Sequence, residues 1–142
     1  MKLHVSFKVA DIETGIDFYS KLFAQSPVIT RSDYAKWDLD DPAVNFVIET
    51  ASDGRAGFDH IGIQTDDADQ LQTISQAMKK TEQEYIDIEQ AHCCYAKSDK
   101  SWVRGIANEA WEVFHTHEHD SDEYGSGFSS LKRMDGSNSC CS

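Results

Sequence analysis

Polar and apolar residues alternate with a period of two over residues 4–9, which read His-Val-Ser-Phe-Lys-Val. The alternation predicts a half-buried strand whose apolar side packs on a helix, with His4, Ser6 and Lys8 on the other side. Residues 11–24 predict that helix, because Asp11 is a suitable N-cap and Ser-Pro follows the last apolar position. Its apolar stripe consists of Ile12, Ile16, Tyr19, Leu22 and Phe23.

Three short β-prone runs follow at residues 28–31, 34–39 and 44–50, divided by polar turn residues. The predicted order to this point is β-α-β-β-β. The same order begins again after the glycine-containing connection at residues 52–57. In the second copy, the alternation at residues 60–64 predicts the first strand. A capping box of Asp67 and Gln70 and the helical stripe Leu71, Ile74 and Met78 predict the helix, and three further strands are predicted at 84–89, 93–97 and 110–115.

The repeat predicts an α+β fold of two paired βαβββ modules, at about residues 3–51 and 58–117. We expect the modules to form a concave, partly open mixed β-sheet barrel within one domain, residues 1–117. A chain of 142 residues suits a single domain. Residues 118–142 are polar with few apolar side chains, so we expect a disordered tail there.

Composition narrows the partners and the compartment. Thirteen Lys and Arg against 25 Asp and Glu give a net charge of -12, which repels nucleic acid and anionic membrane surfaces. The sequence contains no apolar stretch of roughly 18 residues, and its start lacks the pattern of a secretory signal. We therefore expect a cytoplasmic protein, as a monomer or homodimer, that acts on a small molecule.

The four cysteines occur as two adjacent pairs, Cys93-Cys94 and Cys140-Cys141. Neighbouring cysteines are poorly placed to form a disulfide with ordinary geometry, so we expect reduced thiols. Binding of a soft metal or metalloid is one use for such pairs.

His4 and His60 occupy equivalent places in the first strands of the two modules. Glu112, on a late strand, can add a carboxylate to the same cavity. Two imidazoles and one carboxylate with open positions are typical of a non-haem Fe(II) site. Each residue also has an ordinary alternative, since a polar-face histidine is often solvated and a single glutamate is often surface charge. Their joint placement in a repeat favours the metal site.

With these residues placed, the chain resembles the vicinal oxygen chelate superfamily, which contains glyoxalase I, bleomycin-resistance proteins, fosfomycin-modifying enzymes and extradiol dioxygenases. The resemblance covers about residues 3–116 and implies that His4, His60 and Glu112 are the metal ligands. Residues 4–23 and 33–50, and especially Cys-Cys-Tyr-Ala-Lys-Ser-Asp-Lys-Ser-Trp-Val from residue 93, are similar to ArsI-type carbon–arsenic lyases and their cadmium-induced relatives. That resemblance implies a detoxifying dioxygenase that uses Fe(II) and dioxygen to cleave the carbon–arsenic bond of trivalent organoarsenicals.

The cysteine pair has a physical rationale of its own. Trivalent arsenic is thiophilic, so the adjacent thiolates of Cys93 and Cys94 can bind it and leave its organic group facing the metal. Alternatively, both are small apolar residues of a strand, whose side chains would point to opposite faces. Tyr95 and Trp102 are candidates for the wall of an apolar substrate pocket, or for the core. Lys100 is a candidate for orienting substrate, or an exposed loop lysine.

Two features depart from the superfamily pattern. The usual turn before the last strand of that superfamily is Asp-Pro-Asp-Gly-Asn, of which only Asn108 remains here. The sequence therefore leaves open whether Glu112 extends as far as the two histidines. In glyoxalase I a fourth ligand comes from the corresponding strand of the first module, where Asn45 and Glu49 lie. Asn45 at that level would favour an open iron site, whereas coordination by Glu49 would favour a closed, isomerase-like site.

Two other functions stay open on the sequence alone. One is non-enzymatic binding of cadmium or arsenic by the thiols and the histidine-rich segment 115–119. The other is glyoxalase-like isomerisation with Ni, Zn or Mn in place of Fe(II). Cys140 and Cys141 are candidate accessory thiols that capture a metalloid for the pocket.

Overall fold

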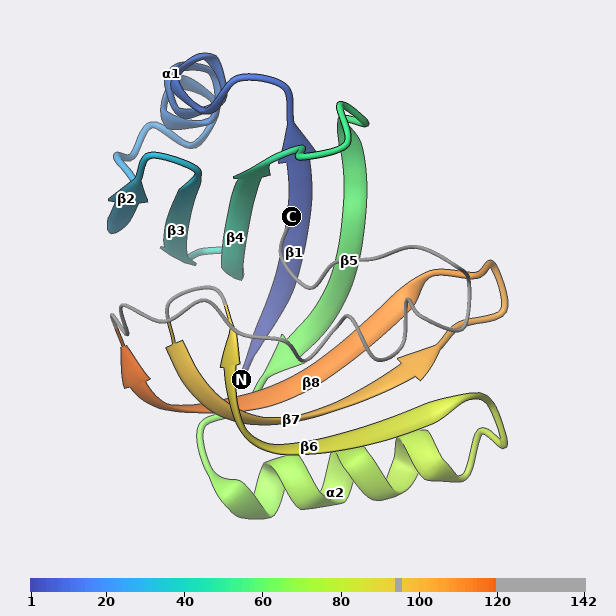
Figure 1. Ribbon diagram of the computed structural model, residues 1–142. Helices are drawn as coiled ribbons and strands as arrows, with labels where there is room; N and C mark the ends of the chain where they lie inside the picture. Colours follow the sequence, from blue (N-terminus) through green and yellow to red (C-terminus); the bar gives the residue numbers. More distant parts are fainter. Residues whose placement is uncertain (94–95, 120–142) are drawn as a thin grey trace. The chain divides into compact units, whose positions relative to one another are not determined.

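The computed structural model describes the backbone of residues 1–93 and 96–119 and the side chains of residues 1–88 and 99–116. The first of its two units contains Lys2–His60, and the second contains Met1 and the described residues from Ile61 onward. Within the described ranges, no helix has the length and apolar character needed to cross a membrane. The elements shown in Figure 1 are β1 (Lys2–Val9), α1 (Ile12–Phe23), β2 (Ile29–Arg31), β3 (Tyr34–Asp40), β4 (Ala43–Thr50), β5 (Gly57–Gln64), α2 (Ala68–Lys79), β6 (Tyr85–Cys93), β7 (Ala96–Arg104) and β8 (Ala110–His119).

The strands form one mixed sheet in the hydrogen-bonded order β2-β3-β4-β1-β5-β8-β7-β6. β1 runs parallel to β4 and β5 runs parallel to β8. The neighbours within β2-β3-β4 and within β6-β7-β8 are antiparallel. Each parallel pair joins the first and last strands of one β-α-β-β-β run, so the predicted α+β fold of repeated βαβββ units is confirmed.

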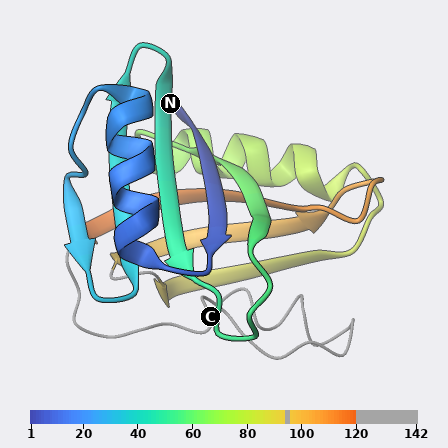
Figure 2. The same cartoon turned by 90° about the horizontal axis from the view of Figure 1, so that it is seen from above.

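Helix α1 packs against one side of the strands of the first unit (Figure 2). Asp11 caps its start, because the Asp11 carboxylate accepts a 2.9 Å hydrogen bond from the backbone N–H of Thr14. Ala24 ends it in the left-handed conformation, with φ of 50°. The core beneath α1 is rich in aromatic residues and includes Ile12, Tyr19, Phe23, Trp37, Phe46 and Ile48.

The predicted stripe of α1 is wrong at one position. Leu22 is 62% exposed, whereas Ile12, Ile16, Tyr19 and Phe23 all contribute to the core. Successive helical residues are about 100° apart around the axis, and the buried stripe is too narrow to include both Leu22 and Phe23.

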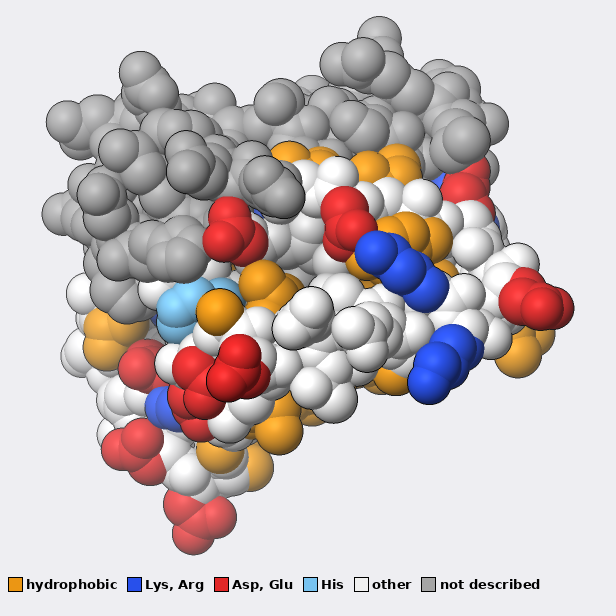
Figure 3. All heavy atoms as spheres, turned by 90° about the horizontal axis from the view of Figure 1, so that it is seen from below, with side chains coloured by type: hydrophobic (Ala, Val, Ile, Leu, Met, Phe, Trp, Pro, Cys, Tyr) orange, Lys and Arg blue, Asp and Glu red, His pale blue; other side chains and the backbone are white. Residues whose placement is uncertain are grey.

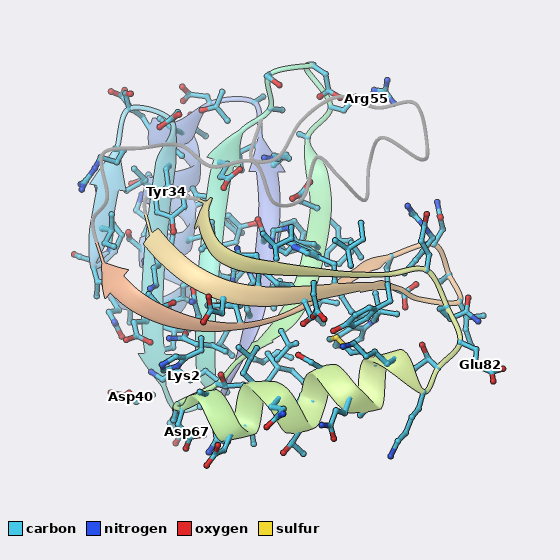
Figure 4. The ribbon with its side chains drawn as sticks, turned by 60° about the horizontal axis from the view of Figure 1, so that its bottom comes forward. Lys2, Tyr34, Asp40, Arg55, Asp67 and Glu82 are labelled. Carbon is cyan, nitrogen blue, oxygen red and sulfur yellow. The ribbon has the colours of Figure 1, made fainter. Side chains whose placement is uncertain are left out.

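Helix α2 of the second unit begins as the sequence predicts. The Asp67 carboxylate accepts a 2.8 Å hydrogen bond from the backbone N–H of Gln70, and Gln70 Oε1 accepts one of 2.9 Å from the N–H of Asp66. In an ideal capping box the Gln70 side chain would accept from the N–H of the N-cap, Asp67, whereas here it accepts from the preceding residue. Asp67 marks this end of the helix in Figure 4. The apolar side of α2 packs in a cluster that includes Leu71, Ile74, Met78, Val103 and Val113.

The bounds of the predicted strand at residues 93–97 are wrong. β6 ends at Cys93, and the next strand, β7, runs from Ala96 to Arg104. The polar run Ser-Asp-Lys-Ser at residues 98–101 hides this strand in the sequence. It is a strand because β6 and β8 both pair with it, which satisfies its backbone groups on both edges.

The turn between β7 and β8 keeps its shape through Asn108. This residue has a φ of 65°, in the left-handed region that asparagine tolerates well. Arg104 Nη1 donates a 3.0 Å hydrogen bond to Asn108 Oδ1, and the N–H of Gly105 donates to the carbonyl of Glu109 at 2.7 Å. The turn therefore closes directly onto β8, which carries Glu112.

Acidic side chains are scattered among few basic ones on the face of the molecule that Figure 3 shows. This distribution agrees with the net charge of -12.

Candidate functional site

Two of the predicted metal ligands meet within the first unit. His4 lies on β1 and His60 lies in the first half of β5. Their Nε2 atoms are 3.0 Å apart, and the two side chains are only 6% and 5% exposed. The structure therefore brings together two residues that are 56 positions apart in the chain.

The outer nitrogens of both rings fix their tautomers. His4 Nδ1 lies 3.2 Å from the carbonyl oxygen of Asn45, and His60 Nδ1 lies 2.7 Å from Oδ2 of Asp59. Both partners are acceptors, so both Nδ1 atoms carry the hydrogen. In the neutral rings, the two facing Nε2 atoms then both present lone pairs. A cation between the nitrogens, either a proton or a metal ion, would satisfy both lone pairs.

The spacing of the two nitrogens fits a shared metal ion. Imidazole nitrogens bind transition metals at roughly 2.0–2.1 Å, so two of them at a right angle lie about 3 Å apart. Metal-binding histidines also usually donate a hydrogen bond from the other ring nitrogen to a carboxylate or a backbone carbonyl, which supports the orientation of the ring. Asp59 and the Asn45 carbonyl lie where they could give His4 and His60 this support.

The side of the first unit's strands that faces away from α1 is polar and largely buried. Strand register places its residues in three rows across β3, β4 and β1. Paired residues point to the same side of a sheet, so each row is a set of neighbours. The rows are Asp38, Asn45 and His4; Lys36, Val47 and Ser6; and Tyr34, Glu49 and Lys8.

A buried ion pair occupies the third row. Lys8 Nζ contacts Glu49 Oε2, and both side chains are less than a tenth exposed. Burial raises the pKa of Glu49 to about 7, against the opposing attraction of Lys8. Glu49 therefore has a protein partner in this structure, whereas Asn45 contacts His4 through its backbone carbonyl. The assignment of either residue as a fourth ligand stays a prediction.

Glu112 and Lys100 meet within the second unit. Lys100 Nζ donates a 2.7 Å hydrogen bond to Glu112 Oε1, and both side chains are buried. Lys100 is on strand β7, not in an exposed loop. Trp102 lies opposite Glu112 in register and is 1% exposed, in a small cluster with Ala110, Ile86 and Ile88.

A glycine faces Glu112 across the parallel pair of β5 and β8. Gly62 is in register with Glu112. A Cβ atom at position 62 would lie 2.5 Å from the Glu112 carbonyl oxygen, which leaves room only for glycine.

Several predicted residues lie outside the described ones. The backbone of Cys93 ends β6, but its side chain is outside the described set, as are Cys94, Tyr95, Cys140 and Cys141 in full. The same holds for the side chains of the histidine-rich segment beyond residue 116 and for the predicted tail. Within that segment His115 is described, and its Nδ1 lies 3.4 Å from the carbonyl of Thr65.

Sequence reasoning missed the supporting residues of the histidine pair. Asp59 directly precedes His60, and a carboxylate beside a candidate metal-binding histidine was the available signal. Lys8 alternates with His4 on the predicted polar strand face, but its pairing with Glu49 depends on the register of β1 against β4.

The cavities among the described residues of the second unit include two that residues of β7 help to line. One of about 480 Å³ lies between α2 and the β7–β8 turn, and the described predicted ligands are not among its lining residues. The other, of about 420 Å³, is lined by polar residues of α2, β6 and β7, including Lys100 and Ser101.

The chain is similar in sequence to several named proteins. It is 33% identical over 114 residues to the trivalent organoarsenical cleaving enzyme of Thermomonospora curvata, covering 80% of this chain and 76% of that protein. It is 31% identical to the probable trivalent organoarsenical cleaving enzyme of Bacillus subtilis, covering 98% and 89%. The cadmium-induced protein CadI of Mycobacterium tuberculosis is 30% identical, covering 99% and 91%. No family model matches the chain.

Solved structures share the fold at low sequence identity. A methylmalonyl-CoA epimerase matches with a TM-score of 0.58 at 11% identity, covering 81% of this chain and 94% of the epimerase. The homoprotocatechuate 2,3-dioxygenase of Arthrobacter globiformis matches with a TM-score of 0.61 at 12% identity, covering 82% of this chain and 36% of the dioxygenase. At these identities the likeness concerns the fold alone.

Proposed function

Because the chain belongs to the family of the trivalent organoarsenical cleaving enzymes and the cadmium-induced protein CadI, within the vicinal oxygen chelate superfamily, we propose that it cleaves the carbon–arsenic bond of trivalent organoarsenicals. Fe(II) is the proposed cofactor and dioxygen the co-substrate. The observation that carries the metal part of this proposal is the pair of facing Nε2 atoms of His4 and His60.

The proposal takes Glu112 as the third protein ligand. Its carboxylate is buried, as are both imidazoles, and oxygen and imidazole donors together suit a non-haem iron ion. Glu112 is in register with Gly62, which follows His60 by two positions on β5. When bound, Fe(II) supplies the electron that dioxygen needs in order to react.

The protein's own groups have separate tasks in this proposal. Asp59 and the Asn45 carbonyl hold the two imidazole rings in the tautomer that presents Nε2. Cys93 and Cys94 bind arsenic as a dithiolate, which fixes the carbon–arsenic bond close to the metal ligands. The buried polar rows of the first unit give the organic group a site with restricted access to water.

Metal stoichiometry tests the ligand assignment. The wild-type chain should bind one Fe(II), and H60A should bind none under the same anaerobic conditions, since a site with two protein ligands is incomplete. H115A is the matched control, because His115 contacts the Thr65 carbonyl and is not a proposed ligand. Equal iron contents in wild type and H60A would remove the histidine pair from the proposal.

The reaction is tested with a trivalent methylarsenical. The Fe(II)-loaded protein should release no arsenite without dioxygen and should release it after air is admitted. The C93S/C94S variant should keep its iron and lose turnover, whereas C140S/C141S should keep most of its activity at saturating substrate. Binding of cadmium or arsenical without any release of arsenite would indicate a sequestering protein. Isomerase activity with Ni or Zn and no need for dioxygen would indicate a glyoxalase-like enzyme.

A further inference from the structure

Lys36 is a half-buried cation on the polar side of the first unit. It lies on β3 between Ala35 and Trp37, and both of these neighbours belong to the core beneath α1. Alternate residues of a strand point to opposite sides, so Lys36 points away from α1, to the side that carries His4. Its row neighbours are Val47 and Ser6.

Two other basic residues of this side, Lys8 and Lys2, have carboxylate partners. Lys8 pairs with Glu49, and Lys2 pairs with Asp38 at 2.6 Å and with Asp40 at 3.2 Å. Figure 4 shows Lys2 close to Asp40. The side chain of Lys36 forms neither an ion pair nor a hydrogen bond with the part of the chain that the structure describes. Burial lowers the pKa of Lys36, because it partly removes the ammonium from water, and the nearby charge of Asp38 offsets this effect only in part.

Ser6 supplies a second unsatisfied group in the same row. Its side chain is fully buried, and its Oγ has no hydrogen-bond partner among the described residues. Two strand spacings, roughly 10 Å, separate the backbones of Lys36 and Ser6, and the flexible stem of lysine shortens that gap. The buried side chain of Val47 lies between them and gives the row an apolar floor. An ammonium, a hydroxyl and an apolar surface together suit an anionic group attached to an apolar body.

The distance between Ser6 and the histidine pair sets the size of the apolar body that can extend from one to the other. Ser6 follows His4 by two positions, about 7 Å along a strand. One aromatic ring with its two substituent bonds spans about this distance. We infer that the Lys36 row, with Lys36, Val47 and Ser6, binds a carboxylate carried by the organic group of the substrate, so that carboxyaryl arsenicals are preferred over unsubstituted aryl arsenicals. This inference rests on the proposed function.

Equilibrium binding tests the inference without turnover. Iron-free protein is titrated anaerobically with trivalent 4-carboxyphenylarsenous acid, with phenylarsenous acid and with benzoate, by calorimetry. K36M should weaken binding of the carboxylated arsenical by about tenfold or more, and binding of phenylarsenous acid by less than about twofold. K36R should keep most of the affinity for the carboxylate. K21M on α1 is the matched control and should match wild type with all three ligands, because Lys21 is exposed.

The outcomes separate this inference from the proposed function. A K36M effect that is equal for both arsenicals, or no effect on either, would overturn the role of the Lys36 row. Benzoate that binds wild type and not K36M would support the anion site even if neither arsenical is ever cleaved. Arsenite release from both arsenicals with no carboxylate preference in wild type would uphold the function and reject the inference.

Discussion

Lys100 and Glu112 form a 2.7 Å ion pair in which both side chains are almost completely buried. The Lys100 ammonium also lies 5.9 Å and 5.8 Å from the ring centroids of Trp102 and Phe114. A buried carboxylate that loses its cation remains desolvated without compensation. In the metal-free chain, Lys100 therefore stabilises the carboxylate that we propose as the third metal ligand.

We predict that K100M lowers the free energy of unfolding of the metal-free protein by about 3–5 kcal/mol, because it leaves Glu112 charged and buried. Urea denaturation in the presence of a chelator measures this loss. K100M/E112Q should recover most of it, since both charges are then absent. K21M breaks only the exposed pair with Asp17 and should change the value by less than about 0.5 kcal/mol. Equal losses in K100M and K21M would contradict the prediction.

The buried carboxyl of Glu49 predicts a dependence of stability on pH. Its pKa is about 7 in the fold, against 4.5 as the ordinary value, with burial as the largest cause. The folded chain therefore binds more protons than the unfolded chain between these two values. The contribution of Glu49 to the free energy of unfolding is complete below about pH 4.5 and is lost as the pH rises through about 7.

Relative to E49Q, the wild-type free energy of unfolding should fall by up to about 3 kcal/mol between about pH 4.5 and 7. Denaturation curves of both proteins at several pH values, with chelator present, measure this difference. E13Q removes an exposed carboxyl from α1 and serves as the control, whose profile should parallel that of wild type. A constant gap between wild type and E49Q over the whole interval would show that this carboxyl does not titrate there.

Replacing Asp59 should weaken metal binding without unfolding the protein. In D59N a neutral amide, which can donate as well as accept, replaces the carboxylate that accepts the Nδ1 hydrogen of His60, so the tautomer of the ring is no longer fixed. We predict a 10–100-fold loss of Fe(II) affinity, measured by competition with a chelator. D17N, on the exposed face of α1, should bind Fe(II) as wild type does. The prediction fails if D59N and D17N have the same affinity.

Position 62 should not tolerate alanine. The added methyl group would overlap the backbone of Glu112, so G62A should displace β8 from β5. G54A is a useful comparison, because that site has a φ of +73° but open space around it. G54A should cost about 1 kcal/mol, whereas G62A should cost several times more and weaken Fe(II) binding as well. Melting temperatures of both variants provide the comparison.

The sequence predicts elements whose signals are local. The alternation in β1 and the cap at Asp11 are written in a few neighbouring residues, and both are present in the structure. β7 was misplaced because its polar residues 98–101 form a strand only through pairing with β6 and β8. Leu22 was misplaced because the width of a buried stripe depends on the strands beneath the helix.

The candidate site is only partly visible in the sequence. Equivalent positions in a repeat predict that His4 and His60 belong together. The contacts of Lys8 with Glu49 and of Lys100 with Glu112 join residues 41 and 12 positions apart, and both depend on strand register. Alternation correctly predicts which residues form the polar side of β1. It also predicts that these residues are exposed to solvent, whereas His4, Ser6 and Lys8 are buried. Burial there comes from neighbouring strands and segments, which a local pattern does not contain.

The two sides of the first unit's strands differ in what they contribute, and this difference matters for directed evolution. Aromatic side chains fill the core beneath α1, so substitutions there carry large penalties. The opposite side holds partly desolvated polar groups, whose joint replacement by apolar groups of similar volume is often neutral or stabilising. A mutant library confined to Lys36, Val47 and Ser6 should therefore contain a larger folded fraction than one of equal size beneath α1. New substrate ranges should be reachable from this chain without prior stabilisation.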